Sequence, residues 1–159
     1  MFSELNSHNS KSTGESYSKF AVPHLIHSVT FVGKMNFHTR KWVKPEDLNP
    51  NNNLFGGRLL QWIDEEAALY TMIQFNNRKI ATKFMSEVNF VSSAVQGDIV
   101  ELGIQVEKFG TTSITLSCIA RNKMTHKPIV TIENITMVNL GEDGKPKSHG
   151  RTEVSYSKR

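Results

Sequence analysis

The chain has little of the chemistry on which many protein families depend. It contains one cysteine, Cys118, in 159 residues, which excludes an intrachain disulfide framework and a cysteine-rich zinc site. No run of about 18 uncharged apolar residues is present, so a transmembrane helix is not expected. The first twenty residues lack the basic start and the apolar stretch of a signal peptide. We therefore expect a soluble, cytoplasmic protein.

Histidine is absent from the central part of the chain. None lies between His38 and His126, so a histidine-based catalytic pair would require two distant segments to meet. No His or Cys residues have the spacing of metal ligands, and no Walker or Rossmann glycine pattern occurs. We expect no metal and no cofactor.

Clustered charge of one sign is also missing. Of the net charge of +4, residues 1–34 carry +1, residues 142–159 carry +2 and residues 35–141 carry +1. A nucleic-acid surface needs clustered positive charge on the folded domain. Because most of the excess lies at the two ends, we expect no nucleic-acid partner, and no membrane partner either.

The pattern of hydrophobic residues divides the chain into three parts. Residues 1–34 are rich in Ser, Asn, Lys and His and show no helical or strand period until about Val29, which predicts a disordered N-terminal extension. A domain is predicted over residues 35–141, and a basic C-terminal tail over residues 142–159.

One long helix is the clearest predicted element. Residues 36–43 are typical of a strand, and the following run PEDLNPNNNLFGG has the composition of turns. From Arg58 to Phe75, apolar residues recur at three- and four-residue spacing around nearly the whole circumference, which predicts a buried helix. Asn76 and Asn77 are expected to end it.

Alternating apolar and polar residues predict four strands after the helix, at about residues 82–90, 100–107, 113–120 and 128–140. Each pattern indicates a half-buried strand with one polar face, and the short connections favour antiparallel pairing. Cys118 shares the core face of its strand with Ile114 and Leu116, which favours a packing role over a nucleophilic one. The predicted fold class is α+β, with an antiparallel sheet wrapped around one long central helix.

Three features of the turn and the helix offer chemistry: Asn49, the Gly56-Gly57 pair and Asp64. Glycines at a helix start leave backbone N–H groups uncovered, and these donors can polarise a carbonyl as its oxygen becomes anionic. A plain tight turn is the alternative for the glycines. Asp64 has small and mainly apolar helical neighbours, so its carboxylate is either used chemically or is a solvated charge on an open face of the helix.

The segment NPNNNLFGGRLLQWIDEEAA resembles the hotdog-fold acyl-CoA thioesterases, specifically the bacterial and organellar acyl-CoA hydrolase group. VNFVSSAVQGDIVEL (88–102), FGTTSITL (109–116) and a late Gly-Lys-Pro also match, so the resemblance covers about residues 35–150. It implies a hotdog fold in which Asn49 and Asp64 form the catalytic pair and Gly56 supplies the carbonyl-polarising N–H. Asn52 stands where the family usually has a loop glycine and can adopt the same positive φ.

The resemblance also implies the substrate, an acyl-CoA, and the residues that bind it. The expected binding residues are Gly57, Arg58, Gly110, Thr111, Thr112 and Ser113, with Thr111 standing where the family often has Arg. Arg58, Lys108 and Arg121 are the cations considered for the CoA phosphates.

The leading functional hypothesis is hydrolysis of an acyl-CoA to a free carboxylic acid and CoA, with Asp64 acting as general base on water or as nucleophile. A 3-hydroxyacyl dehydratase of the same fold is one alternative, but that chemistry usually pairs a histidine with a carboxylate. A non-enzymatic acyl-CoA sensor is the other, but 34 polar residues are too few for a helix-turn-helix output module.

The spacing of the expected groups predicts a shared active site. Asp64 lies seven or eight residues beyond the Gly56-Gly57 helix start, which is roughly 11 Å along a helix axis. A base and an oxyanion donor must both lie within about 3 Å of the reacting group. If both serve one bond, two antiparallel helices from a two-fold dimer must supply them. The resemblance agrees, since it implies a homodimer that commonly assembles further into a hexamer, a trimer of dimers.

Overall fold

The computed structural model describes residues 35–155, and the predicted disordered extension over residues 1–34 lies outside them. The elements are, in chain order, β1 (Asn36–Trp42), a 3-10 turn η1 (Pro45–Asp47), α1 (Gly56–Phe75), β2 (Ile80–Met85), β3 (Val88–Phe90), β4 (Ile99–Phe109), β5 (Ser113–Asn122) and β6 (Pro128–Asn139).

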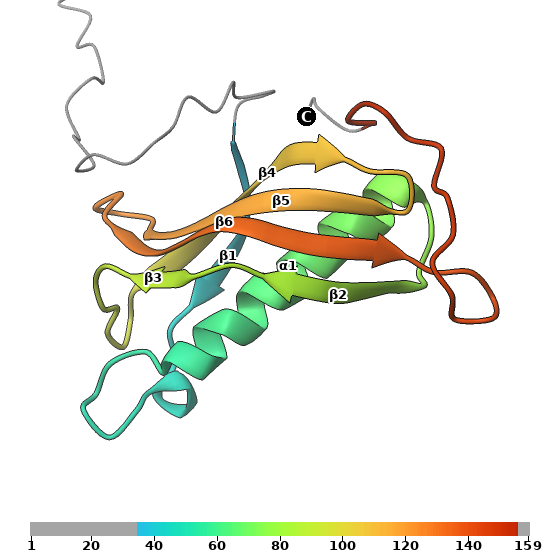
Figure 1. The fold of residues 1–159 in the computed structure, drawn as a ribbon. Helices are drawn as coiled ribbons and strands as arrows, with labels where there is room; N and C mark the ends of the chain where they lie inside the picture. The colour runs from blue at the N-terminus through green and yellow to red at the C-terminus, as the bar shows by residue number, and fades with distance from the viewer. Residues whose placement is uncertain (1–34, 156–159) are drawn as a thin grey trace, which may run out of the picture. The chain divides into compact units, whose positions relative to one another are not determined.

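All strands belong to one antiparallel sheet, and α1 lies along one of its faces (Figure 1). The strand order is β1-β4-β5-β6-β2, and β3 continues the β2 edge by also pairing with β6. The long neighbours β4, β5 and β6 follow one another in the chain, so the short turns between them set their antiparallel register. This is the predicted arrangement of one helix against an antiparallel sheet.

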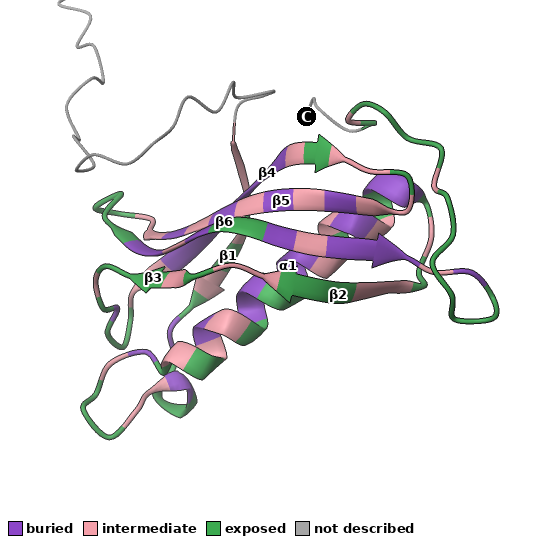
Figure 2. Cartoon of the chain, viewed as in Figure 1, coloured by how far each residue is buried: buried purple, intermediate pink, exposed green. Residues whose placement is uncertain are grey.

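The core lies between α1 and the sheet (Figure 2). From the helix it takes Leu59, Trp62, Ile63 and Ala67, and from the sheet it takes the alternating apolar residues of β4, β5 and β6. Cys118 is 1% exposed within this core, as its alternation with Ile114 and Leu116 predicted. Asn76 adopts a left-handed conformation with φ 51° and ends α1 at the predicted position.

Three expectations from the sequence need correction. α1 is not buried all round, because Leu69 and Ile73 are exposed on one side. Residues 82–90 do not form one half-buried strand: the ladder breaks at residues 86–87, and Phe84 and Phe90 are exposed. The second departure lies at the open β2–β3 edge, where no further element of residues 35–155 extends the sheet.

The third correction concerns β4, whose expected polar face is buried. Glu101 is 0% exposed because the neighbouring β5 places Arg121 over it and Lys123 reaches it from the β5–β6 turn. Arg121 in turn lies over the ring of Phe37 from β1, with the guanidinium carbon 3.6 Å from the ring centroid. A central strand has neighbours on both sides, so long side chains cover even its outward face.

Residues 141–155 pack back onto the domain. The His149 ring stacks on Phe75 at the end of α1, with the ring centroids 4.0 Å apart. The backbone N–H of His149 donates to the carbonyl of Thr111. Farther along, the Ser155 N–H donates to Gln74 Oε1 at 2.9 Å. The described part of the predicted tail therefore joins the C-terminal end of α1 to the β4–β5 turn.

Candidate active site

The loop that carries Asn49 is fixed by its own hydrogen bonds. Asn49 Oδ1 accepts the N–H groups of Asn51 at 2.9 Å and Asn53 at 3.2 Å, while the Asn49 N–H donates to the carbonyl of Asn53 at 2.8 Å. Asn52 has φ 59°, the conformation expected for the residue that replaces a glycine. Because two N–H donors occupy Oδ1, the Asn49 side chain offers its Nδ2 amide as a donor to a ligand.

The start of α1 presents unused backbone donors. Phe55 occupies the N-cap position and provides no side-chain hydrogen bond, and the first turn contains no acidic residue. The Phe55 carbonyl accepts the N–H groups of Arg58 and Leu59, so the Gly56 and Gly57 N–H groups precede the first intrahelical bonds. Together with the positive end of the helix dipole, these N–H groups can stabilise an oxygen that becomes anionic.

Gly56 also permits a close contact at this helix start. A Cβ at this position would lie 3.2 Å from the ring of Phe90, which β3 carries. The glycine therefore lets the exposed edge strand pack directly against the first turn of α1.

Asp64 lies in the middle of α1 and faces the edge strand β2. It is exposed, and its Oδ1 accepts a hydrogen bond from Thr82 Oγ1 at 2.7 Å. This bond fixes one carboxylate oxygen and leaves Oδ2 for another partner. Within a single chain, Asp64 therefore lies on an open face of the helix, which is one of the two interpretations that the sequence left open. The hydrogen bond from Thr82 gives its carboxylate a defined position.

The two glutamates after Asp64 have different surroundings. Glu65 is exposed and pairs with Lys41 of β1, with Nζ and Oε2 3.2 Å apart. Glu66 is buried and accepts a hydrogen bond from the hydroxyl of Thr39. The three consecutive carboxylates are thus divided between solvent and core.

Large apolar side chains are exposed on α1, at its N-cap and on the strand edge that carries Thr82. Phe55 and Phe90 are 56% and 52% exposed, and Leu69 and Ile73 are 49% and 57% exposed on α1. Phe84, from the same edge strand as Thr82, is 54% exposed. The exposed Phe84 and Phe90 of the open β2–β3 edge favour an interface with a second molecule there.

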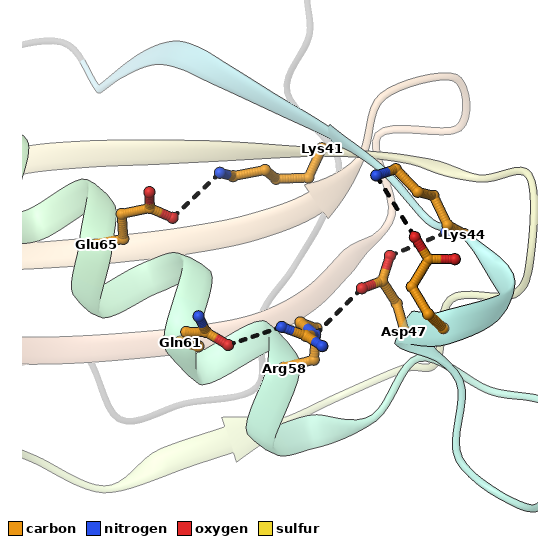
Figure 3. A network of polar contacts seen from close by, with 7 residues as sticks. Lys41, Lys44, Asp47, Arg58, Gln61 and Glu65 are labelled. Carbon is orange, nitrogen blue, oxygen red and sulfur yellow. Dashed lines mark hydrogen bonds and ion pairs between the residues drawn. The ribbon is translucent and has the colours of Figure 1, made fainter.

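Arg58 is held at the helix start by protein groups (Figure 3). Its Nε lies 3.1 Å from Asp47 Oδ1, and its NH1 donates to Gln61 Oε1 at 2.9 Å. The Asp47 side chain is 9% exposed, whereas that of Arg58 is 37% exposed. The cation expected to contact CoA therefore has a buried carboxylate as its partner in the chain itself.

The second expected binding segment lies at the opposite end of α1. The Gly110 N–H donates to the Ser113 carbonyl at 2.8 Å and closes the β4–β5 turn. A cavity of about 830 Å³ lies beside this turn, lined by residues 106–111 and residues 148–154. Lys108, Gly110 and Thr111 line it, whereas Thr112, Ser113, Asn49 and Asp64 do not.

Two sequence candidates have a structural role. Arg121 pairs with the buried Glu101, with Nε and Oε1 2.7 Å apart. Burial, together with the charge of Glu66, raises the pKa of the Cys118 thiol to about 12, so this residue is unsuited to a nucleophilic role.

The structure therefore groups Asn49, Gly56, Gly57 and Arg58 at the N-terminal end of α1, places Asp64 in its middle and places residues 110–113 at its C-terminal end. The residue that sequence reasoning missed is Thr82. The alternating pattern around Thr82 indicates a strand. The contact of Thr82 with Asp64 depends on how α1 packs across the sheet, and the local sequence does not encode that packing. Across residues 35–155, no helix has the length and apolar character to cross a membrane, and no three His, Cys, Asp or Glu side chains are grouped to hold a metal ion.

Comparison with known proteins identifies the family. Residues 51–129 match the family model described as Thioesterase superfamily. The uncharacterized acyl-CoA thioester hydrolase YkhA of Bacillus subtilis is 33% identical over 107 residues, which cover 65% of this chain and 62% of that protein. A solved apo-hexameric acyl-CoA thioesterase is 37% identical with a TM-score of 0.60, over 69% of this chain and 72% of that one. The chain belongs to the thioesterase superfamily.

Further similarity within the superfamily extends to the acyl-CoA hydrolase of Staphylococcus aureus, solved with butyryl-CoA and CoA. It is 30% identical with a TM-score of 0.63, over 69% of this chain and 66% of that one. The chain spans about three fifths of the length of the curated relatives it matches. These similarities confirm the predicted hotdog fold of this thioesterase-superfamily member.

Proposed function

We propose that the protein is an acyl-CoA thioesterase, which hydrolyses the thioester to a free carboxylic acid and CoA. The observation that carries the proposal is the Asp64 carboxylate, exposed on α1 and held there by a hydrogen bond from Thr82 of the edge strand β2. The names of its relatives support this substrate, since they are acyl-CoA thioester hydrolases, and the S. aureus hydrolase was solved with butyryl-CoA.

Asp64 supplies the proton-accepting or nucleophilic oxygen. As general base, its Oδ2 takes a proton from water, the water oxygen attacks the carbonyl carbon, the carbon–sulfur bond breaks and the CoA thiolate receives the proton. As nucleophile, Oδ2 itself attacks, CoA leaves, and water hydrolyses the resulting mixed anhydride. In both routes the Thr82 hydroxyl keeps Oδ1 occupied and Oδ2 directed at the reacting group. Neither route requires a metal or cofactor.

Asn49 and Gly56 act as hydrogen-bond donors. Asn49 Nδ2 orients the water or the thioester, and the Gly56 N–H holds the developing oxyanion. Variants of the S. aureus hydrolase that replace an Asn or an Asp with Ala have been solved, and the two positions are fifteen residues apart. Asn49 and Asp64 have the same spacing, which supports this pair.

One thioester cannot meet both Gly56 and Asp64 of a single helix, since they are separated by roughly 12 Å along the axis. We therefore propose a homodimer in which Asp64 of one subunit faces the helix start of its partner. The exposed Phe84 and Phe90 of the sheet edge and Leu69 and Ile73 of α1 support this interface. The hexameric state named for a structural relative supports a trimer of such dimers.

CoA binding is proposed for two segments of the chain. Gly57 and Arg58 lie at the helix start, and Gly110, Thr111, Thr112 and Ser113 form the β4–β5 turn beside the cavity. Lys108 lines that cavity and supplies a cation for a CoA phosphate. The expected cytoplasmic location, and the absence of nucleic-acid and membrane partners, stay predictions.

The test compares hydrolysis of acetyl-, butyryl- and palmitoyl-CoA by wild type, Asp64→Asn and Glu65→Gln. Glu65 is a matched control because it is the adjacent, exposed carboxylate of the same helix. We expect Asp64→Asn to lower kcat by at least a hundredfold and Glu65→Gln to leave it within about twofold of wild type. Tight acyl-CoA binding without turnover would instead establish a sensor, and hydration of crotonyl-CoA without hydrolysis would establish a dehydratase.

A further inference from the structure

Asp47 connects three parts of the region around Asn49. Its Oδ2 accepts the Lys44 N–H at 3.0 Å, which closes the turn after β1. Its backbone carbonyl accepts the N–H of Phe55, the N-cap of α1, at 2.8 Å. Its Oδ1 lies 3.1 Å from Nε of Arg58 in the first turn of the helix. One residue thus joins the end of β1, the end of the Asn49 loop and the helix start.

The charge of Asp47 creates an electrostatic problem that Arg58 solves. The Asp47 carbonyl accepts the Phe55 N–H, and the Asp47 carboxylate contacts Arg58, so the carboxylate lies beside the helix start. The Asp47 side chain is only 9% exposed to solvent. A buried negative charge at this position would oppose an oxyanion on the Gly56 N–H. Figure 3 shows the Arg58 guanidinium directed at the carboxylate and held on its other side by Gln61.

The other charged groups in Figure 3 are all more exposed than the Asp47 side chain. Lys44 Nζ lies 3.6 Å from Glu46 Oε1, and both side chains are more than half exposed. Lys41 pairs with Glu65, which is also half exposed. Solvent screens such pairs, so Arg58 is the cation in this network that compensates the buried carboxylate.

We infer that Asp47 and Arg58 form a positioning pair for catalysis: the carboxylate fixes the Asn49 loop against the start of α1, and the guanidinium cancels its charge next to the oxyanion. This inference rests on the proposed thioesterase function. Neither side chain needs to touch the acyl group, so loss of the pair should lower kcat rather than raise KM. If Arg58 served only as a contact to a CoA phosphate, its loss would raise KM, and Asp47 would have no part in the effect.

The experiment measures kcat and KM for an acyl-CoA in Arg58→Met, Asp47→Asn and the double variant, with Lys41→Met as control. Arg58→Met leaves the buried carboxylate unpaired, and we expect kcat to fall about tenfold or more. Asp47→Asn keeps an acceptor oxygen without the charge, so kcat is expected within about threefold of wild type. The double variant is expected to recover most of the kcat lost in Arg58→Met, because no net charge remains. Lys41→Met breaks the ion pair between β1 and the half-exposed Glu65 of the same helix and should leave kcat unchanged.

Each outcome decides the inference. If the wild type hydrolyses acyl-CoA but Arg58→Met keeps the wild-type kcat, the inferred role of the pair is wrong and the thioesterase proposal stands. The same conclusion follows if Arg58→Met raises only KM and adding Asp47→Asn does not reverse that increase. A wild type without hydrolysis would overturn the thioesterase proposal and this inference with it. If thermal unfolding shows that Arg58→Met does not fold, Asp47→Ala replaces it: Ala cannot accept the Lys44 N–H, so kcat should fall about fivefold or more below that of Asp47→Asn. Equal kcat values in these two variants would contradict the inference.

Discussion

Thr82 on the edge strand β2 donates a hydrogen bond to Asp64 in the middle of α1, with Oγ1 and Oδ1 2.7 Å apart. The bond joins the helix to the open edge of the sheet, where Phe84 of the same strand is exposed. It gives the carboxylate one fixed oxygen and one free oxygen. This division is what a general base or a nucleophile requires.

Removing the Thr82 hydroxyl should therefore lower turnover without unfolding the protein. In Thr82→Val, which keeps the shape of the side chain, we expect kcat to fall about tenfold because the Asp64 carboxylate is free to rotate. Thr82→Ser keeps the hydroxyl and should retain most of the activity. The separation of kcat from KM is the discriminating readout, since loss of a bond that positions the carboxylate should lower kcat and leave KM near its wild-type value in Thr82→Val alone. Identical kcat values in the two variants would show that the bond has no part in catalysis.

The buried Glu101 should make stability depend on acid. Burial acts to raise the pKa of Glu101, but hydrogen bonds and charge interactions from Lys123 and Arg121 lower it below its ordinary value of 4.5. A carboxyl with a lowered pKa in the folded state stabilises fully above that ordinary value, and its contribution is lost as the pH falls through the folded-state pKa. At pH 7, Glu101→Gln should cost about 2 kcal/mol of unfolding free energy, because the two cations that bind it are partly exposed.

Calorimetry across pH checks this sign. The Tm difference between wild type and Glu101→Gln should close as the pH falls below 4.5, because protonated Glu101 then resembles Gln. Glu142→Gln is the matched control: this carboxylate pairs with Lys79 but is exposed, and its loss should leave Tm unchanged. A Tm difference for Glu101→Gln that stays constant down to pH 3 would contradict the account.

Cys118 should resist thiol reagents in the folded protein. Its side chain is 1% exposed, and burial raises its pKa to about 12, so almost no thiolate is present near neutral pH. Alkylation by iodoacetamide, followed by mass spectrometry, should modify Cys118 only after denaturation. Stoichiometric modification of native protein at pH 8 would show that the core around β5 opens more readily than the packing indicates.

The fold was largely predictable because its elements carry strong local signals. The alternation in β4, β5 and β6 and the apolar residues of α1 predicted the sheet and the helix, and Asn76 marked the end of the helix through its tolerance of positive φ. Glu101 was expected on a polar face because alternation describes one strand at a time. Its burial depends on Arg121 and Lys123, which belong to the neighbouring strand and turn.

The site was only partly predictable for a related reason. Asn49, Gly56 and Asp64 lie within one continuous motif, so their sequence spacing indicates their relative positions. Thr82 contacts Asp64 through the packing of α1 against β2, and Asp47 meets Arg58 because the loop folds back onto the helix start. The exposed Phe84 and Phe90 were expected in the core because hydrophobicity alone does not distinguish a core from an interface between subunits.

The most direct test of the account is whether two inactive subunits restore one active site. The account places Asn49 and Gly56 of one subunit with Asp64 of its partner, so Asn49→Ala and Asp64→Ala should each be inactive alone. After mixed unfolding and refolding, with subunit exchange verified by mass spectrometry, a heterodimer of the two regains one intact site and should show about half the wild-type activity. The double variant Asn49→Ala/Asp64→Ala, exchanged with either single variant, is the control and should stay inactive. No recovery after verified exchange, or full activity in a monomer, would contradict the composite site.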